Sequence, residues 1–207
     1  MIDLDYTSVV FAAGLIVGAT LNLLLLRTLL APPFRIWPAP EPGSWQSLTF
    51  WGLFRGGMVL TFVVAVLDWN SAGLVDLSRL VVGVPLFLVG FGITVLGYFN
   101  LGLGNTYCGA DGLVSHGLYR FSRNPQYASS ILGLVGLVIC ANSWFTLPLA
   151  LFMIGAYVLM ALVEEAWLDQ HYGASYKEYC ARTARFFDAQ GLILAVIEKK
   201  QPSRRIG

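Results

Sequence analysis

Residues 126–163 read QYASSILGLVGLVICANSWFTLPLALFMIGAYVLMALV, an uninterrupted stretch without a charged side chain. A membrane-spanning helix needs about 20 mostly apolar residues, so this stretch is too long for a single crossing even when the helix is tilted. Asn142 and Ser143 near its middle form a turn-favouring pair. The stretch therefore predicts a tight helical hairpin, with a short first arm over residues 126–141 and a full-length second arm over residues 144–163.

Three further apolar segments precede the hairpin, at residues 9–26, 48–67 and 80–99. The chain is 57% hydrophobic and 12% charged, with a mean hydropathy of +0.68, whereas a soluble domain carries about 25% charged residues. A chain of 207 residues cannot bury so much apolar surface in one core, so part of that surface must face lipid. We expect an all-α integral membrane protein, a bundle of about five transmembrane helices that ends in the C-terminal hairpin.

We expect these elements to form a single membrane domain. Residues 1–99 supply three spans, residues 100–187 a polar loop, the hairpin and a polar segment, and residues 188–207 a tail. Within the tail, the apolar residues 191–197 are expected either to lie along the membrane surface or to pack on the protein. The chain has three cysteines, Cys108, Cys140 and Cys180. They are too widely spaced for a disulfide framework or a zinc site. We expect neither a metal nor a nucleic-acid partner.

Lysine and arginine residues lie almost entirely on one side of the predicted bundle. One set of loops contains only Arg79, and the other contains Arg27, Arg35, Arg120, Arg123, Lys177, Arg182, Arg185, Lys199, Lys200, Arg204 and Arg205. Because cytoplasmic loops carry the excess of positive residues, we expect the N-terminus outside and the C-terminus in the cytoplasm. We place the protein in the inner membrane of a prokaryote.

Arg55 is the one charged residue inside the second predicted span. Such an arginine either extends towards a helix end or faces a pocket. Its position near the middle of the span favours a buried partner.

The predicted topology brings three polar segments together at the cytoplasmic end: the loop 101–126, the pair Glu164-Glu165 and the segment 169–187. Ionisable groups at the lipid boundary are costly unless they are paired or functional. Two adjacent carboxylates at a helix end therefore indicate either a site, to which His116 contributes if it points inward, or the water boundary of the last span. The pair Gly90 and Gly92 is expected to allow close helix packing, and Gly102 and Gly104 to form a loop turn.

Three motifs carry a resemblance to a known family. They are Gly117-Leu-Tyr-Arg-Phe-Ser-Arg-Asn-Pro-Gln-Tyr127, the Glu164-Glu165 pair, and Tyr172-Gly-Ala-Ser-Tyr-Lys-Glu-Tyr179 followed by Arg185-Phe-Phe187. In this order and spacing, residues 101–187 resemble the integral membrane methyltransferase superfamily, which includes isoprenylcysteine carboxyl methyltransferases and phospholipid N-methyltransferases.

The resemblance implies S-adenosylmethionine as cofactor, in a pocket at the cytoplasmic end of the last helices, and a hydrophobic or lipid methyl acceptor that enters from the bilayer. It implies catalytic roles for Arg123, Asn124 and Glu165. It also implies that the cofactor contacts Leu113, Val114, Gly117, Tyr119, Arg123, Asn124, Pro125, Tyr127, Glu164 and Glu165.

One position departs from the family pattern, because many members have histidine where this chain has Asn124. Asparagine can still form hydrogen bonds, but it cannot act as a base. Two alternatives to a methyltransferase follow from the sequence. A sterol-reductase-like enzyme would use NADPH, and a non-catalytic membrane scaffold would keep the fold without activity.

Overall fold

The computed structural model describes residues 5–31, 33–74, 76–101 and 112–187. Six α-helices and one short 3-10 helix, but no strand, occur in these ranges. The helices are α1 (Tyr6–Leu30), α2 (Trp45–Leu67), α3 (Arg79–Leu101), α5 (Pro125–Ala141), α6 (Thr146–Tyr172) and α7 (Ala174–Arg182), with the 3-10 helix η1 (Gly117–Arg120) before α5. The prediction of an all-α membrane protein is confirmed for this part of the chain.

Four of these helices are long and apolar enough to cross a membrane, namely α1, α2, α3 and α6. Helix α5 is equally apolar but has only 17 residues, a length of about 25 Å. Together α5 and α6 form the predicted hairpin, with α5 as its short arm. Asn142 ends α5 in the left-handed conformation, at φ 45°, which asparagine tolerates better than most residues.

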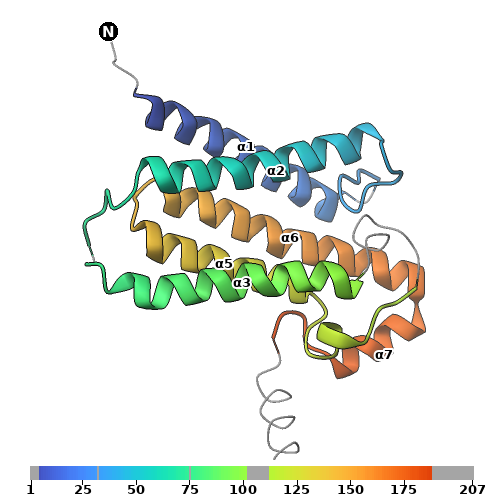
Figure 1. The fold of residues 1–207 in the computed structure, drawn as a ribbon. Helices are drawn as coiled ribbons and strands as arrows, with labels where there is room; N and C mark the ends of the chain where they lie inside the picture. The colour runs from blue at the N-terminus through green and yellow to red at the C-terminus, as the bar shows by residue number, and fades with distance from the viewer. Residues whose placement is uncertain (1–4, 32, 75, 102–111, 188–207) are drawn as a thin grey trace, which may run out of the picture.

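Helix α6 lies at the centre of the bundle, in contact with α1, α2, α5 and α7, whereas α3 packs mainly on α5 (Figure 1). The long helices run side by side. At one end of the bundle α1 and α3 finish, α2 and α5 begin, and α7 lies below the end of α6 (Figure 1). The turns after α2 and α5 lie together at the opposite end.

Three glycines at seven-residue spacing allow α3 to approach α5 closely. An added Cβ at Gly83, Gly90 or Gly97 would lie 2.6 Å from Cys140 Sγ, 2.3 Å from Gly133 N and 2.5 Å from Gln126 Cγ respectively. The contacted residues on α5 are also seven apart and follow in reverse order, as antiparallel packing requires. Small residues at helix interfaces are typical of membrane bundles, because they let the backbones come close together.

We predict that Gly90→Ala destabilises the bundle, by about 1–3 kcal/mol, because its Cβ would meet the backbone of α5. Gly92→Ala is the matched control, since a Cβ at Gly92 has nothing within 4 Å; alanine favours the helix there by up to about 1 kcal/mol. Thermal unfolding in detergent would measure both effects. Equal unfolding temperatures for the two variants would contradict this packing.

At the opposite end of the bundle, Asp68 joins the end of α2 to the α5–α6 turn. Its Oδ2 accepts hydrogen bonds from Ser71 Oγ, Ser143 Oγ and the Phe145 N–H. Burial opposes ionisation of Asp68, but these three hydrogen bonds outweigh it and lower the pKa of the carboxyl below its ordinary value of 3.8. The ionised carboxylate is therefore part of the folded state.

From this shift we predict an acid-dependent loss of stability. A depressed native pKa means that Asp68 stabilises the fold above pH 3.8, its ordinary value, and that the contribution disappears as pH falls through the native pKa. Asp68→Asn should lower the unfolding temperature near neutral pH and flatten its dependence on pH below about 4. An unchanged pH dependence in the variant would contradict this role.

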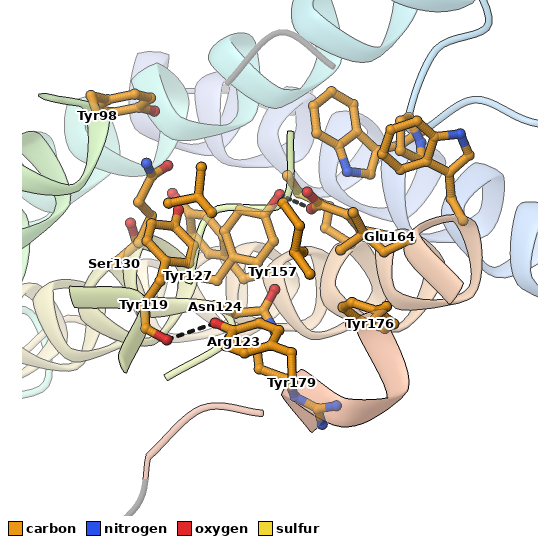
Figure 2. Close-up of a pocket in the computed structure, with 18 of the residues that line it drawn as sticks. Tyr98, Tyr119, Arg123, Asn124, Tyr127, Ser130, Tyr157, Glu164, Tyr176 and Tyr179 are labelled. Atoms are coloured by element: carbon orange, nitrogen blue, oxygen red, sulfur yellow. Dashed lines mark hydrogen bonds between the residues drawn. The ribbon is translucent and has the colours of Figure 1, made fainter. Parts of the chain in front are cut away.

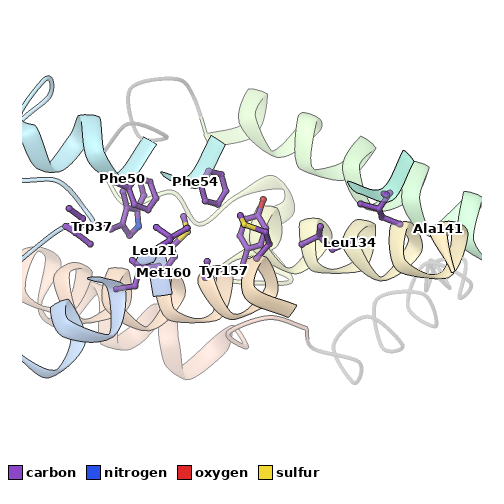
Figure 3. Packing of buried hydrophobic residues seen from close by; sticks show 14 residues of the cluster. Leu21, Trp37, Phe50, Phe54, Leu134, Ala141, Tyr157 and Met160 are labelled. Carbon is purple, nitrogen blue, oxygen red and sulfur yellow. The ribbon is translucent and has the colours of Figure 1, made fainter. Parts of the chain in front are cut away.

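The segment between α1 and α2 folds back onto the helices. Ile36 is fully buried and donates its N–H to Thr28 Oγ1 at 3.1 Å. Trp37 stacks on Phe50 with 4.3 Å between ring centroids, next to Leu21 and Met160 in the main cluster of buried apolar side chains (Figure 3). This packing holds Trp37 against α6 near Met160 (Figure 3).

Helix α6 differs from the prediction in length. The sequence places the end of the second arm at Val163, but α6 continues to Tyr172. Glu164 and Glu165 therefore lie within a helix rather than at its end. The helix continues past the apolar stretch because residues 164–172 contain neither glycine nor proline, and it ends at Gly173, whose φ is 54°. Hydrogen bonds and ion pairs from other segments satisfy both carboxylates.

Candidate active site

A cavity of about 100 Å³ lies at the end of the bundle near α7. Its wall comes from the segment before α2, from α2, α3, α5, α6 and α7, and from the residues around η1 (Figure 2). About half of the lining side chains are aromatic: Trp37, Trp51, Phe54, Tyr98, Tyr119, Tyr127, Tyr157, Trp167, Tyr172, Tyr176 and Tyr179. Such a wall suits a cationic or planar ligand.

Glu164 is the carboxylate that lines this cavity. Its Oε2 accepts a hydrogen bond of 2.6 Å from the Tyr127 hydroxyl (Figure 2). The Tyr127 ring contacts Tyr157, which contacts Phe54, with centroid distances of 5.6 and 5.4 Å. The carboxylate is thus held in one place and faces an aromatic enclosure that could accept a positive charge.

Glu165 lies in a different environment, between two arginines. Arg185 binds both of its carboxylate oxygens, with Nε to Oε1 at 2.9 Å and an Nη to Oε2 at 2.8 Å. Arg123 approaches Oε1 to 3.3 Å, and only 13% of the Glu165 side chain is exposed. The hydrogen bonds from Arg185 to Glu165 raise the pKa of that guanidinium, which stays charged.

Helix geometry separates the two glutamates. Consecutive residues of an α-helix point about 100° apart around the axis. Glu164 consequently faces the cavity, whereas Glu165 faces the arginines that follow α7 and precede α5. Adjacent in sequence, the two carboxylates have distinct partners and support distinct chemistry.

Asn124 lines the cavity and also fixes the segment after α7. Its Nδ2 donates to the Arg185 carbonyl at 3.1 Å, and its backbone N–H donates to the same carbonyl at 3.1 Å. The N–H of Arg123 binds the Ala184 carbonyl at 2.9 Å. Residues 123–124 and 184–185 therefore form a short paired segment beneath the cavity, which positions Arg185 for Glu165.

Three tyrosines around η1 and α7 stay protonated. Burial raises the pKa of Tyr119, Tyr176 and Tyr179 well above the ordinary value of 10.0. The Tyr179 hydroxyl donates to the Tyr119 carbonyl at 2.7 Å and ties α7 to η1 (Figure 2). These residues can donate hydrogen bonds but carry no charge.

Three buried nitrogens in the cavity wall have no hydrogen-bond partner among the described residues: Trp37 Nε1, Arg123 Nε and Gln126 Nε2. Buried donors are normally satisfied, so an unpaired one suggests a ligand or water. The wall thus combines a carboxylate, aromatic faces and unpaired cationic and amide donors. This set fits a zwitterionic nucleoside cofactor, whose ammonium, carboxylate and ring need these groups.

The cavity contains most of the residues that the sequence predicts for the cofactor: Leu113, Val114, Tyr119, Arg123, Asn124, Tyr127 and Glu164. Three predicted residues do not line it. Gly117 begins η1 at φ 60°, Pro125 is the first residue of α5, and Glu165 pairs with the arginines. His116 is exposed at the start of η1 rather than pointing inward. Residues 102–111 and 191–197, which include Gly102, Gly104 and Cys108, lie outside the described residues.

The N-terminal half of the chain also lines the cavity, through Trp37, Trp51 and Phe54, which sequence reasoning missed. When a helix is apolar on every side, the sequence around an aromatic residue does not show whether its ring lines a cavity or packs in the core. Arg55, one residue after Phe54, is exposed. The expectation of a buried partner for it is wrong.

One comparison with known proteins finds a family that covers part of the cavity wall. Residues 78–175 match the family model for phospholipid methyltransferases, a region that runs from the start of α3 into α7. It contains Glu164, Asn124 and Tyr127. No curated protein and no solved structure matches the chain. Residues 78–175 are thus similar to the phospholipid methyltransferase family, a similarity consistent with the integral membrane methyltransferase superfamily that the motifs predict.

Proposed function

We propose that the protein is an S-adenosylmethionine-dependent methyltransferase that acts on a membrane-resident lipid, in a cavity that opens at the cytoplasmic leaflet. The main support for the proposal is the position of Glu164, which lines an aromatic cavity and whose Oε2 accepts a hydrogen bond of 2.6 Å from the Tyr127 hydroxyl. The family match supports methyl transfer. The excess of arginine at this end of the bundle supports the cytoplasmic orientation.

For the cofactor site we propose the cavity residues among those predicted, namely Leu113, Val114, Tyr119, Arg123, Asn124 and Tyr127. Arg123 would bind the cofactor carboxylate through its unpaired Nε. The aromatic faces would surround the sulfonium, since a cation is attracted to a ring face. When bound, S-adenosylmethionine supplies an electrophilic methyl group.

The acceptor that suits Glu164 best is an amine. Methyl transfer then forms a nitrogen–carbon bond and breaks the sulfur–carbon bond, and the amine must lose a proton. Glu164 can accept that proton, while Tyr127, which donates to Glu164, keeps the carboxylate oriented. The exclusion of water by the aromatic wall favours in-line displacement of the methyl group. Glu165 would act as a positioning residue, through Arg123.

The proposal is tested with the full chain in lipid vesicles, incubated with S-adenosylmethionine that carries a labelled methyl group. We expect label in the extracted lipid fraction, in wild type and in the control variant His116→Ala, whose exposed side chain lies outside the cavity. Folded protein that oxidises NADPH instead, and transfers no label to a total membrane lipid extract, would overturn the proposal.

A further inference from the structure

Arg55 is a charged side chain on the lipid-facing surface of α2. It is exposed, and among the described residues it forms neither a salt bridge nor a hydrogen bond. Its guanidinium carbon lies 4.8 Å from the centroid of the Trp51 ring, one turn nearer the start of α2. An unpaired cation within a span is costly and marks a functional position more often than an accidental one.

The register between α2 and α3 locates Arg55 at an opening in the bundle. Phe62, on the same stripe of α2 but seven residues later, contacts Phe87 and Phe91 of α3 at 6.0 and 5.6 Å. The two helices are antiparallel (Figure 1), so Arg55 lies level with the part of α3 about seven residues beyond those phenylalanines. That part contains Thr94 and Tyr98, both of which line the cavity.

At this level α2 and α3 do not pack together. The two helices are not among the extensively contacting pairs, and they draw apart towards the end of the bundle that carries α7 (Figure 1). Tyr98 is 36% exposed and lies at the edge of the cavity, away from Glu164 (Figure 2). Trp51, the ring beneath Arg55, lines the same cavity. Among the described residues, Trp51 of α2 and Tyr98 of α3 therefore line the cavity on this side without extensive packing between the two helices, and Arg55 lies beside Trp51.

The surface of α2 next to Arg55 is bare. A Cβ added at Gly52 or at Gly56 would have nothing within 4 Å. A headgroup or the upper part of an acyl chain can therefore lie against the helix backbone there, with the guanidinium alongside. Guanidinium forms two parallel hydrogen bonds with phosphate oxygens, which is the strongest anion recognition available to a single side chain.

We propose that Arg55 binds the phosphodiester of the lipid acceptor at the opening between α2 and α3. The inference rests on the proposed function and adds a specificity-determining residue to it, one that lies outside the matched residues 78–175. From the lipid towards the cavity, the positive charge of Arg55 comes first and the carboxylate of Glu164 comes second. A lipid with an anionic phosphate and a terminal amine would meet both groups with opposite charges.

The test is native mass spectrometry of the full chain in detergent, with dioleoyl phosphatidylethanolamine or dioleoylglycerol, which has the same acyl chains but no phosphate. We expect wild type to prefer the phospholipid by about tenfold, and Arg55→Gln to lose that preference. Arg55→Lys should keep part of it. Arg27→Gln is the matched control, because Arg27 is also exposed and stacked on a ring, that of Phe34 at 4.3 Å, but Phe34 lies outside the cavity wall, whereas Trp51, the ring beside Arg55, lines it.

An unchanged preference in Arg55→Gln, or none in wild type, would overturn the proposal. Displacement of the phospholipid by millimolar inorganic phosphate would also overturn it, in favour of a site for a soluble anion. S-adenosylhomocysteine titrated into the same preparations separates the two proposals. If it binds wild type and Arg55→Gln equally while the lipid preference is unchanged, only the role of Arg55 fails. If it binds neither, the methyltransferase assignment fails.

Discussion

Glu164→Gln should reduce methyl transfer by at least about a hundredfold, because the removal of a general base costs about 10²–10⁴ in rate. Glutamine has nearly the same shape and can still accept the hydrogen bond from Tyr127, which measures 2.6 Å in wild type. It cannot take a proton from an amine or pair with an ammonium group. Rates with labelled S-adenosylmethionine in vesicles, at saturating cofactor, would measure the loss.

The unfolding temperature supplies the control for this variant. Glu164 forms no ion pair among the described residues, so Glu164→Gln should unfold within a few degrees of wild type. Tyr127→Phe removes the hydrogen bond that orients the carboxylate and should give a smaller loss of rate, of about tenfold. Full activity in Glu164→Gln would contradict the central role of this carboxylate.

Glu165→Gln should act first on stability. Its removal leaves Arg123 and Arg185 without the carboxylate that binds both of them. The loss of one partner from a largely buried ion pair costs about 3–5 kcal/mol; because 43% of the Arg185 side chain is exposed, we expect about 2 kcal/mol here. Thermal unfolding in detergent would show the decrease.

The comparison between the two glutamates is the informative part. Glu165→Asp should recover part of the lost stability, because a shorter carboxylate can still reach one arginine. S-adenosylhomocysteine affinity should fall in Glu165→Gln as the segment around Arg185 loosens, and KM for the cofactor should change more than kcat. If Glu165→Gln kept wild-type stability but lost turnover, Glu165 rather than Glu164 would be the reacting carboxylate.

The sequence predicted the helices well because uninterrupted apolar stretches and one turn-favouring pair determine them. The hairpin turn at Asn142 is where the Asn-Ser pair indicated it. Gly90 is a close-packing glycine, as predicted, but Gly92 faces open space. A glycine pair in a sequence does not tell which member faces the neighbouring helix. That choice depends on the rotation of α3 against α5.

The site was harder to predict for two physical reasons. The part of α6 before Val163 is apolar on every side, so its pattern defines no face that could be followed past Val163. The end of the helix and the different directions of Glu164 and Glu165 could therefore not be determined from the pattern. The contribution of Trp37 depends on how the segment before α2 folds back onto Phe50, a tertiary contact without a local signal. The resemblance, by contrast, indicated the residues around η1 and α5, because they lie in motifs.

The central claim is that this cavity binds S-adenosylmethionine, and calorimetric titration of the detergent-purified full chain with S-adenosylhomocysteine tests it most directly, with NADPH titrated in parallel. We predict saturable binding of S-adenosylhomocysteine by wild type and by Gly92→Ala, a loss of at least about tenfold in affinity for Arg123→Gln, which lacks the donor proposed for the cofactor carboxylate, and no binding of NADPH. Binding of NADPH alone by folded protein would contradict the account and favour a reductase, and binding of neither would favour a scaffold.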